Sequence, residues 1–256
     1  MRPILLASCA ALILGGAFVA AGVTSPFRLT APAAAAIEGG DRASFGKRVR
    51  DYLVTNPEVL VEAMQELERR QDGQRDAVAQ KAIREHKTEL FSDPDNPVGG
   101  NASGDVVIVD FNDYQCPYCK RAHQAIKSVV AADGKVKLIY KDLPILGEPS
   151  RIAALAALAA AKQGKHLAVH NALMEYSGKL DRDRILEIVA STGVDMAQLE
   201  KDMDDPKFKQ LIDRNMALAG ALGVRGTPAF VIGGQFVPGA IDADTLKQLI
   251  AEARKR

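Results

Sequence analysis

The spacing of apolar positions divides the chain into a helical first part, a middle part with strands, and a second helical stretch. Residues 43–92 are rich in helix formers and poor in Gly and Pro. The run VVIVDF at 106–111 is β-branched and apolar on both faces, which predicts a strand buried inside a sheet. A second strand is predicted at 136–143, with a helix at 117–132 between the two. Residues 149–222 are almost wholly helical in pattern.

Turn-forming residues separate these segments. The stretch SDPDNPVGGNASGD at 92–105 is dense in turn formers, which indicates a linker or a domain boundary. Near the C-terminus, Gly233 and Gly234 stand between two β-rich runs in TPAFVIGGQFVPG, which predicts a hairpin. A last helix is predicted from about Asp242. The order of these elements predicts an α/β protein.

The first residues form a separate segment. Arg2 precedes an uncharged run from Ile4 to Val23, and APAAAA follows at 31–36. This order predicts a signal peptide at 1–36, cleaved after Ala36, and export to the periplasm. An uncleaved membrane anchor is the main alternative, and LASC at 6–9 superficially resembles a lipoprotein box with too few apolar residues before it.

Cys9 lies in this segment, so the exported chain keeps only Cys116 and Cys119 of the three cysteines. An oxidising compartment makes a disulfide available to this pair. The formal net charge of +1 gives no electrostatic reason to expect nucleic acid as a partner.

The motif Cys-Pro-Tyr-Cys at 116–119 lies between the first strand and the following helix. Cys116 takes the N-cap position and Pro117 the first helical position, where its missing N–H is no loss. The unpaired amides and the positive helix end favour a thiolate at Cys116. Cys119 follows one turn later and faces the interior, so Cys116 can attack a substrate disulfide and Cys119 can resolve the product.

A static disulfide and a metal site are the alternatives for this pair. A closed zinc site needs about four ligands, and no second cysteine pair supplies them. His166 and His170 have i,i+4 spacing, but on a polar helix they are predicted to be solvated rather than ligands. His123 is predicted on the solvent side of its helix. The pair therefore indicates redox chemistry, with no metal or other cofactor.

Two parts of the sequence carry a family resemblance: residues 106–123 with CPYC, and residues 223–239 with Gly-Thr-Pro. They resemble the thioredoxin superfamily, and the helical insertion resembles its DsbA-type thiol:disulfide oxidoreductases. The N-terminal helices running into LFSDPDNPVGG resemble the suppressor-of-copper-sensitivity C (ScsC) proteins. The resemblance implies a thioredoxin fold with an inserted helical domain, preceded by a helical oligomerisation segment. The expected boundaries are 37–98 for that segment and linker, and 99–256 for the catalytic domain, with its insertion at about 147–222.

The resemblance also assigns roles to residues. Asp110, six residues before Cys116, matches the family's buried acid that relays protons to the resolving thiol. A carboxylate at the end of an apolar strand is costly to bury unless it has a use; the alternative is a wet strand end. Thr227 and Pro228 match the cis-proline segment beside the cysteines. The expected substrate-binding residues are Pro117, Tyr118, Thr227 and Pro228.

Two positions depart from strongly oxidising DsbA proteins, many of which have His between the cysteines and Val before the cis-proline. Tyr118 cannot carry the positive charge of a His, and Thr227 replaces the Val. These departures favour an isomerase or a mild oxidant acting on cysteine-containing exported proteins, with a membrane redox partner. Copper(I) binding through the same two thiolates is the alternative function, and an oligomer that holds unfolded chains is a third.

Apolar residues of the first helical part recur at helix-pairing intervals. Leu60, Met64 and Leu67 form one stripe. Phe45, Val49 and Tyr52 form a shorter stripe before a break at Asn56-Pro57, where Asn56 is predicted to cap the next helix. The stripes predict a homo-oligomer, which the ScsC-like resemblance makes a trimer, with a soft point at QDGQ (71–74). The alternative is that they pack on the chain's own catalytic domain.

Overall fold

The structure is a computed structural model that describes residues 39–256, so the predicted signal peptide and its cleavage site lie outside the described residues. Residues 39–60 belong to one compact unit, and residues 61–256 form a second. No helix in the described part of the chain is long and apolar enough to cross a membrane.

Two helices make up the N-terminal part, α1 (Gly39–Thr55) and α2 (Glu58–Glu85). They separate at Asn56-Pro57, as predicted, but the Asn56 side chain donates to the Tyr52 carbonyl at 2.9 Å. The Asn56 backbone N–H donates to the same carbonyl at 2.8 Å, so Asn56 closes the last turn of α1 in place of the predicted cap of α2. Helix α2 continues through Gly73 without a break.

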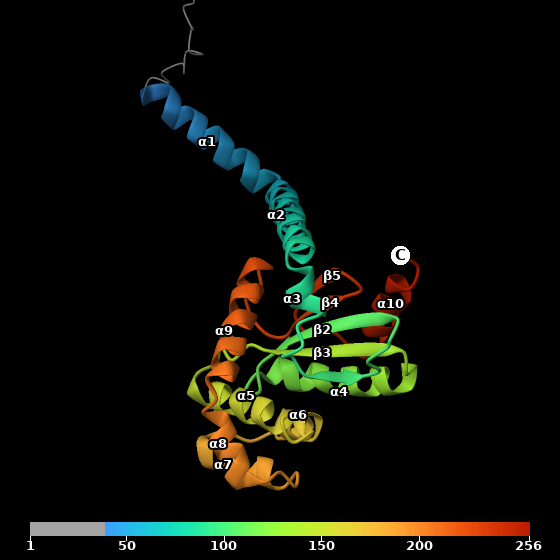
Figure 1. The fold of residues 1–256 in the computed structure, drawn as a ribbon. Helices are drawn as coiled ribbons and strands as arrows, with labels where there is room; N and C mark the ends of the chain where they lie inside the picture. The colour runs from blue at the N-terminus through green and yellow to red at the C-terminus, as the bar shows by residue number, and fades with distance from the viewer. Residues whose placement is uncertain (1–38) are drawn as a thin grey trace, which may run out of the picture. The chain divides into compact units, whose positions relative to one another are not determined.

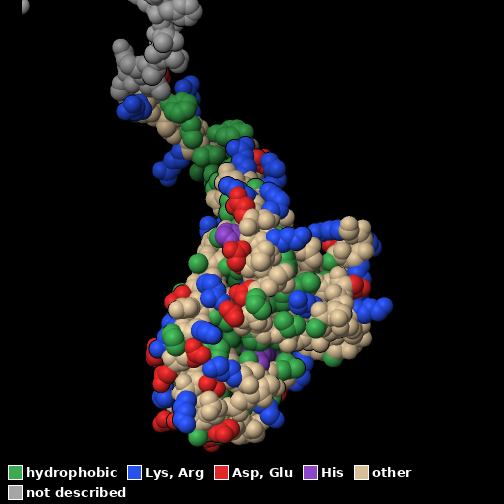
Figure 2. Space-filling model, viewed as in Figure 1, with side chains coloured by type: hydrophobic (Ala, Val, Ile, Leu, Met, Phe, Trp, Pro, Cys, Tyr) green, Lys and Arg blue, Asp and Glu red, His purple; other side chains and the backbone are tan. Residues whose placement is uncertain are grey.

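The predicted stripes are exposed. In α1, Phe45 and Tyr52 are 52% and 58% exposed, and Figure 2 shows apolar side chains gathered on this helix. In α2, Met64 and Leu67 are 63% and 55% exposed. Large apolar side chains exposed in a row are typical of a surface that binds another chain.

A five-stranded sheet forms the centre of the second unit, in the order β1-β3-β2-β4-β5. Its strands are β1 (Val98–Gly100), β2 (Val106–Asn112), β3 (Val136–Asp142), β4 (Ala229–Ile232) and β5 (Gln235–Pro238). β2 and β3 run parallel, with Asp110 opposite Tyr140, while the other neighbours pair antiparallel. The three predicted strand regions are confirmed, including the hairpin turn at Gly233-Gly234.

The alternation of side chains along β2 gives the sheet two covered faces. Ile108 packs in a cluster with α4 (Pro117–Asp133) and α10 (Ala243–Ala253), and α4 runs along the sheet in Figure 1. Val109 packs on the other face, in a cluster with the end of α2, with α3 (Lys87–Phe91) and with the end of α9 (Pro206–Ala221). A strand with both faces buried is apolar throughout, as VVIVDF is.

Between β3 and β4 the chain forms five helices with their own core. They are α5 (Glu148–Ala161), α6 (His166–Glu175), α7 (Arg182–Ala190), α8 (Met196–Met203) and α9 (Pro206–Ala221). The alanines of α5 between 153 and 160 are buried at their centre, which allows close helix packing. Cys116 and Cys119 belong to this same cluster, so the cysteine motif lies where the helical insertion meets the sheet.

The segment predicted as a linker contributes to the fold. Val98–Gly100 pairs with β3 and forms an edge of the sheet. This pairing uses only backbone groups, so it forms even though two of the three residues are glycine. Before it, Ala82, Ile83 and Leu90 are buried against the sheet residues of the second face. The packed body therefore includes residues before the proposed boundary at 99.

Candidate active site

Cys116 ends the loop after β2 and caps α4, as predicted. Its Sγ accepts from the Cys119 N–H at 3.4 Å, and Pro117 occupies the first turn. The Cys116 N–H donates to the Asp113 carbonyl at 3.0 Å, which closes the turn before the helix. The sulfur of Cys116 is therefore held at the positive end of a helix of 17 residues.

Exposure does not distinguish the two cysteines, since Cys116 is 4% and Cys119 is 3% exposed. Their surroundings differ. The Cys116 thiol contacts the carbonyl of Thr227 at 3.2 Å. Burial raises the pKa of the Cys119 thiol well above its usual range, and the nearby Asp110 carboxylate raises it further. The proton of Cys119 is thus strongly held unless a base accepts it.

Asp110 lies on β2 and is buried, at 6% exposure. Burial raises the pKa of Asp110 to about 8, and the charge of Asp142 adds to the shift. Burial likewise raises the pKa of Asp142 to about 7. Two carboxyl groups that titrate near neutral pH therefore lie below the motif. The sequence prediction included Asp110 but missed Asp142. Asp142 could have been found because it is an acidic residue at the end of the strand next to β2.

Asp113 is a further residue that sequence reasoning missed. Its Oδ2 accepts from the N–H groups of Ile145 and Leu146 at 2.9 and 3.0 Å. Its Oδ1 accepts from the Ser150 hydroxyl at 2.7 Å and from the Gln115 N–H at 2.8 Å. One buried carboxylate thus fastens the cysteine loop to the start of the helical insertion. Asp113 could have been found from the sequence because Asp is a common turn residue and this one lies three residues before Cys116.

The predicted substrate-binding residues lie close to Cys116. The Thr227-Pro228 peptide bond is cis, as the resemblance implied. Pro117 and Tyr118 are exposed at the start of α4. The guanidinium of Arg121 lies 5.1 Å from the centre of the Tyr118 ring, which places a cation beside the motif that the sequence prediction did not include.

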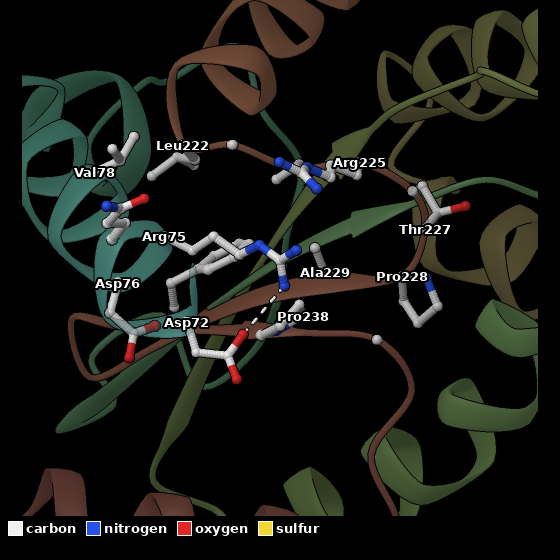
Figure 3. A pocket seen from close by; sticks show the side chains of 16 residues that line it. Asp72, Arg75, Asp76, Val78, Leu222, Arg225, Thr227, Pro228, Ala229 and Pro238 are labelled. Carbon is white, nitrogen blue, oxygen red and sulfur yellow. Dashed lines mark hydrogen bonds and ion pairs between the residues drawn. The ribbon is translucent and has the colours of Figure 1, made fainter. Parts of the chain in front are cut away.

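A groove of about 800 Å³ opens beside this proline, and we call it the proline groove (Figure 3). Asp72, Arg75, Asp76 and Val78 of α2 form one wall, and Arg225, Thr227 and Pro228 belong to the other. Arg75 pairs with Asp72 at 3.1 Å. Arg225 forms no ion pair with any residue that the structure describes. The apolar lining of the groove also includes Leu222, Val224, Ala229, Phe236 and Pro238.

The histidines contradict the sequence prediction. His123, His166 and His170 were expected to be solvated, yet they are 7%, 7% and 1% exposed. The face of α6 that carries His166 and His170 packs toward α4 and β3, where Tyr114 and Tyr140 complete an aromatic cluster. The i,i+4 spacing therefore marks a buried helix face.

These histidines are held as neutral groups. The Tyr114 hydroxyl and His170 Nδ1 are 3.0 Å apart. Burial lowers the pKa of His170 well below its usual range and that of His166 to about 4. Among residues 39–256, no group of three or more His, Cys, Asp or Glu side chains could hold a metal ion.

Comparison with known proteins gives the family. The model of the DSBA-like thioredoxin domain matches residues 107–251, more than half of the chain. The chain belongs to the DsbA-like thioredoxin family. The model of the copper resistance protein ScsC N-terminal domain matches residues 41–74, which include both exposed stripes.

Solved structures of this family cover most of the described chain. A thioredoxin-like oxidoreductase from Silicibacter pomeroyi DSS-3 is 46% identical, with a TM-score of 0.65, over 66% of this chain and 98% of that one. A linker-deletion variant of Proteus mirabilis ScsC is 32% identical, with a TM-score of 0.66, over 87% of this chain and 99% of that one. The second similarity extends the family assignment into the N-terminal helices.

Curated relatives include longer proteins of a different kind. The Na(+)/H(+) antiporter NhaA 1 of Salinispora arenicola is 26% identical over 164 residues, or 63% of this chain. The chain spans about a quarter of the length of that antiporter and of the similar antiporters it matches.

Proposed function

We propose that the protein is an exported thiol–disulfide oxidoreductase that exchanges disulfides with cysteine-containing proteins. The position of Cys116 carries the proposal. Its sulfur caps a helix and contacts the carbonyl of Thr227 at 3.2 Å, beside a groove open to solvent. A dithiol pair at a helix start, with a buried acid near the second sulfur, suits exchange chemistry.

The reaction follows from the different surroundings of the two sulfurs. When the protein acts as an oxidant, a substrate thiolate attacks Cys116 of the Cys116–Cys119 disulfide, and the S–S bond breaks. The Cys119 sulfur leaves with the electron pair and takes a proton from Asp110. A second substrate thiolate then attacks the substrate sulfur of the mixed disulfide, and Cys116 leaves as a thiolate. The substrate is oxidised by two electrons, and the protein is reduced by two.

Asp110 supplies that proton because its own pKa, about 8, lies near neutral pH. Near pH 7 the carboxyl group holds a proton that it can give, and in the reverse direction it can take the proton back. The very high pKa of the Cys119 thiol makes such a partner necessary, since a buried thiolate without a proton is costly.

The proline groove suits an extended polypeptide as substrate. Its wall at Thr227 and Pro228 adjoins the attacking sulfur, and its apolar lining suits the side chains of an unfolded chain. Backbone groups of such a chain could pair with the exposed segment around Thr227, which gives affinity without strict sequence choice. We assign Thr227 and Pro228 to substrate contact on this basis. Pro117 and Tyr118 are assigned to substrate contact because they are exposed next to Cys116.

The exposed stripes support a homo-oligomer, and the ScsC-like relationship supports a trimer. Several active sites in one assembly can reach different disulfides of one substrate, which favours isomerisation. Tyr118 in place of a His also favours an isomerase or a mild oxidant, recharged by a membrane redox partner. Export to the periplasm rests on the N-terminal signal pattern, and a relative from Salmonella enterica is itself described as a periplasmic thioredoxin-like protein.

A side-by-side assay tests the activity. The protein is given a polypeptide with scrambled disulfides and, separately, a reduced dithiol peptide, and its redox potential is measured. We expect native disulfides to be restored faster than the dithiol peptide is oxidised. A protein that binds copper(I) through both thiolates but performs neither reaction would instead be a copper-sequestering protein.

Two matched substitutions test the assembly. Met64→Glu places a charge in the exposed stripe, whereas Gln65→Glu adds the same charge on another face of α2. Light scattering should give an oligomer for wild type and Gln65→Glu and smaller species for Met64→Glu. Monomeric wild type would refute the assembly. Isomerase activity should fall with the oligomer, while dithiol oxidation persists.

A further inference from the structure

A second cavity, of about 440 Å³, lies beside α4, and we call it the histidine cavity. Its inner lining includes Asp110, His123, His170 and Tyr140. The outer lining includes the exposed residues Asn101, Lys127, Ala131 and Leu167. The cavity therefore connects the solvent-facing surface of α4 with the buried acid that serves Cys119.

The polar atoms around this cavity lack partners from the protein. Among the described residues, nothing forms a hydrogen bond with Asp110 Oδ1 or with His123 Nε2, although both side chains are more than nine-tenths buried. A buried polar atom without a partner destabilises the fold, because it has given up its hydrogen bond to water. A polar cavity of this size has room for several water molecules, which would satisfy these atoms.

A series of groups that can pass a proton continues from the cavity to the surface. The Tyr114 hydroxyl lies 3.0 Å from His170, whose ring centre is 5.2 Å from that of His123. His123 Nε2 is 3.8 Å from Glu175 Oε1. The Glu175 side chain is 42% exposed and pairs with Lys127 at 2.6 Å. Neutral imidazoles both donate and accept a proton, so they suit this position.

We propose that the histidine cavity is the route by which protons pass between Asp110 and solvent, with His123 as a buried lining group that carries the proton. This inference rests on the proposed function, in which Asp110 exchanges a proton with Cys119 in every cycle. Asp110 must then regain or lose that proton before the next cycle. His123 acts through Asp110 and is a positioning residue for the reaction.

The charged and titratable groups around the route come from several elements. Asp142 and Tyr140 face Asp110 from β3, and Cys119 faces it from α4. His123 is influenced by Glu175 of α6 and by Lys127 of its own helix, and burial lowers its pKa. A neutral His123 can therefore carry a proton without holding it at neutral pH.

The test uses a matched pair of surface alanines in the full chain. Ala131 lines the outer cavity, whereas its neighbour Ala132 is also exposed and does not line it. Ala131→Trp should cover the opening, and Ala132→Trp is the control. The readout is hydrogen–deuterium exchange of the protonated Asp110 carboxyl group, followed by infrared spectroscopy after mixing into D₂O at about pH 6, below the pKa of that group. Asp110→Asn and Asp142→Asn variants assign the two carboxyl bands.

Exchange at Asp110 should slow by about a hundredfold or more in Ala131→Trp and in His123→Leu, because positioned proton transfer contributes on the order of 10²–10⁴-fold. It should be unchanged in Ala132→Trp. Equal exchange rates in all of these proteins would overturn the route. The measurement needs no thiol–disulfide activity, so an inactive wild type would refute the proposed function while leaving this test intact.

Discussion

The proline groove and the histidine cavity each include a residue that acts on one of the two cysteines, and they are lined by different kinds of residue. The groove is lined by the exposed wall of α2 and by the segment around Thr227, next to the Cys116 sulfur. The cavity is lined by buried titratable groups and reaches Asp110, whose charge acts on Cys119. Each sulfur thus has its own surroundings, although the two are equally buried.

This difference explains how two neighbouring cysteines can have separate roles. Substrate must approach the sulfur that attacks, and the groove provides an open apolar surface for it. A proton must approach the sulfur that resolves, and the cavity provides polar groups that can carry it. This division predicts that changes on the groove side alter substrate binding, and that changes on the cavity side alter proton transfer.

The largest effects are expected at the sulfurs themselves. Cys116→Ala should lower exchange by about 10³-fold or more, because the attacking group is lost. Cys119→Ala should lower turnover by a similar factor but accumulate a mixed disulfide with the substrate, visible by mass spectrometry under non-reducing conditions. If the mixed disulfide accumulates in Cys116→Ala instead, Cys119 is the attacking cysteine and Cys116 the resolving one.

Asp110→Asn should slow the proton-dependent step by about a hundredfold at pH 7, measured by rapid-quench detection of the mixed disulfide.

The same substitution should stabilise the fold. The pKa of Asp110 is about 8 in the folded protein against 3.8 for the free group, so the folded state binds more protons between these values. The contribution of Asp110 to the free energy of unfolding is therefore fully present below about pH 4 and is lost as the pH rises through about 8.

The gain from Asp110→Asn should accordingly be small at about pH 4 and largest above about pH 8. It should reach at most about 6 kcal/mol, at about 1.4 kcal/mol for each unit of the pKa shift from 3.8 to about 8. Urea unfolding at several pH values measures it. A gain that does not depend on pH would show that the Asp110 carboxyl titrates normally.

A smaller effect is expected at the groove wall. Val78→Asp should raise the KM for a polypeptide substrate by about tenfold, equivalent to the loss of about 1.4 kcal/mol of apolar contact. Ala77→Asp, an exposed neighbour that does not line the groove, is the control. Oxidation of a small dithiol should be unchanged in both variants. An equal effect of both substitutions would mean that substrate does not contact α2.

Much of the architecture was readable from local pattern. The run VVIVDF predicted a strand buried on both faces, and CPYC after it predicted the N-cap and the start of α4, because both depend on neighbouring residues. β1 was missed because Val98–Gly100 has little strand propensity and becomes a strand only through its partner β3.

The parts of the site that were missed depend on tertiary packing. His166 and His170 lie on a helix that looks polar in sequence, and their burial follows from α6 packing toward α4 and β3. Asp142 and Asp113 gain their surroundings from distant segments, as the contacts of Asp113 with Ile145 and Ser150 illustrate. Cysteine spacing indicated the chemistry, whereas the groups that tune it required the fold.

The central claim is that substrate and proton reach the cysteines separately, and one kinetic comparison tests it directly. Val78→Asp, Ala131→Trp and the double variant are compared with wild type for polypeptide exchange, with KM and the rate of mixed-disulfide resolution measured in each. The account predicts that Val78→Asp changes only KM, that Ala131→Trp changes only resolution, and that the double variant shows both changes at full size, since independent effects add as free energies. A rise in KM caused by Ala131→Trp, or slower resolution caused by Val78→Asp, would contradict it.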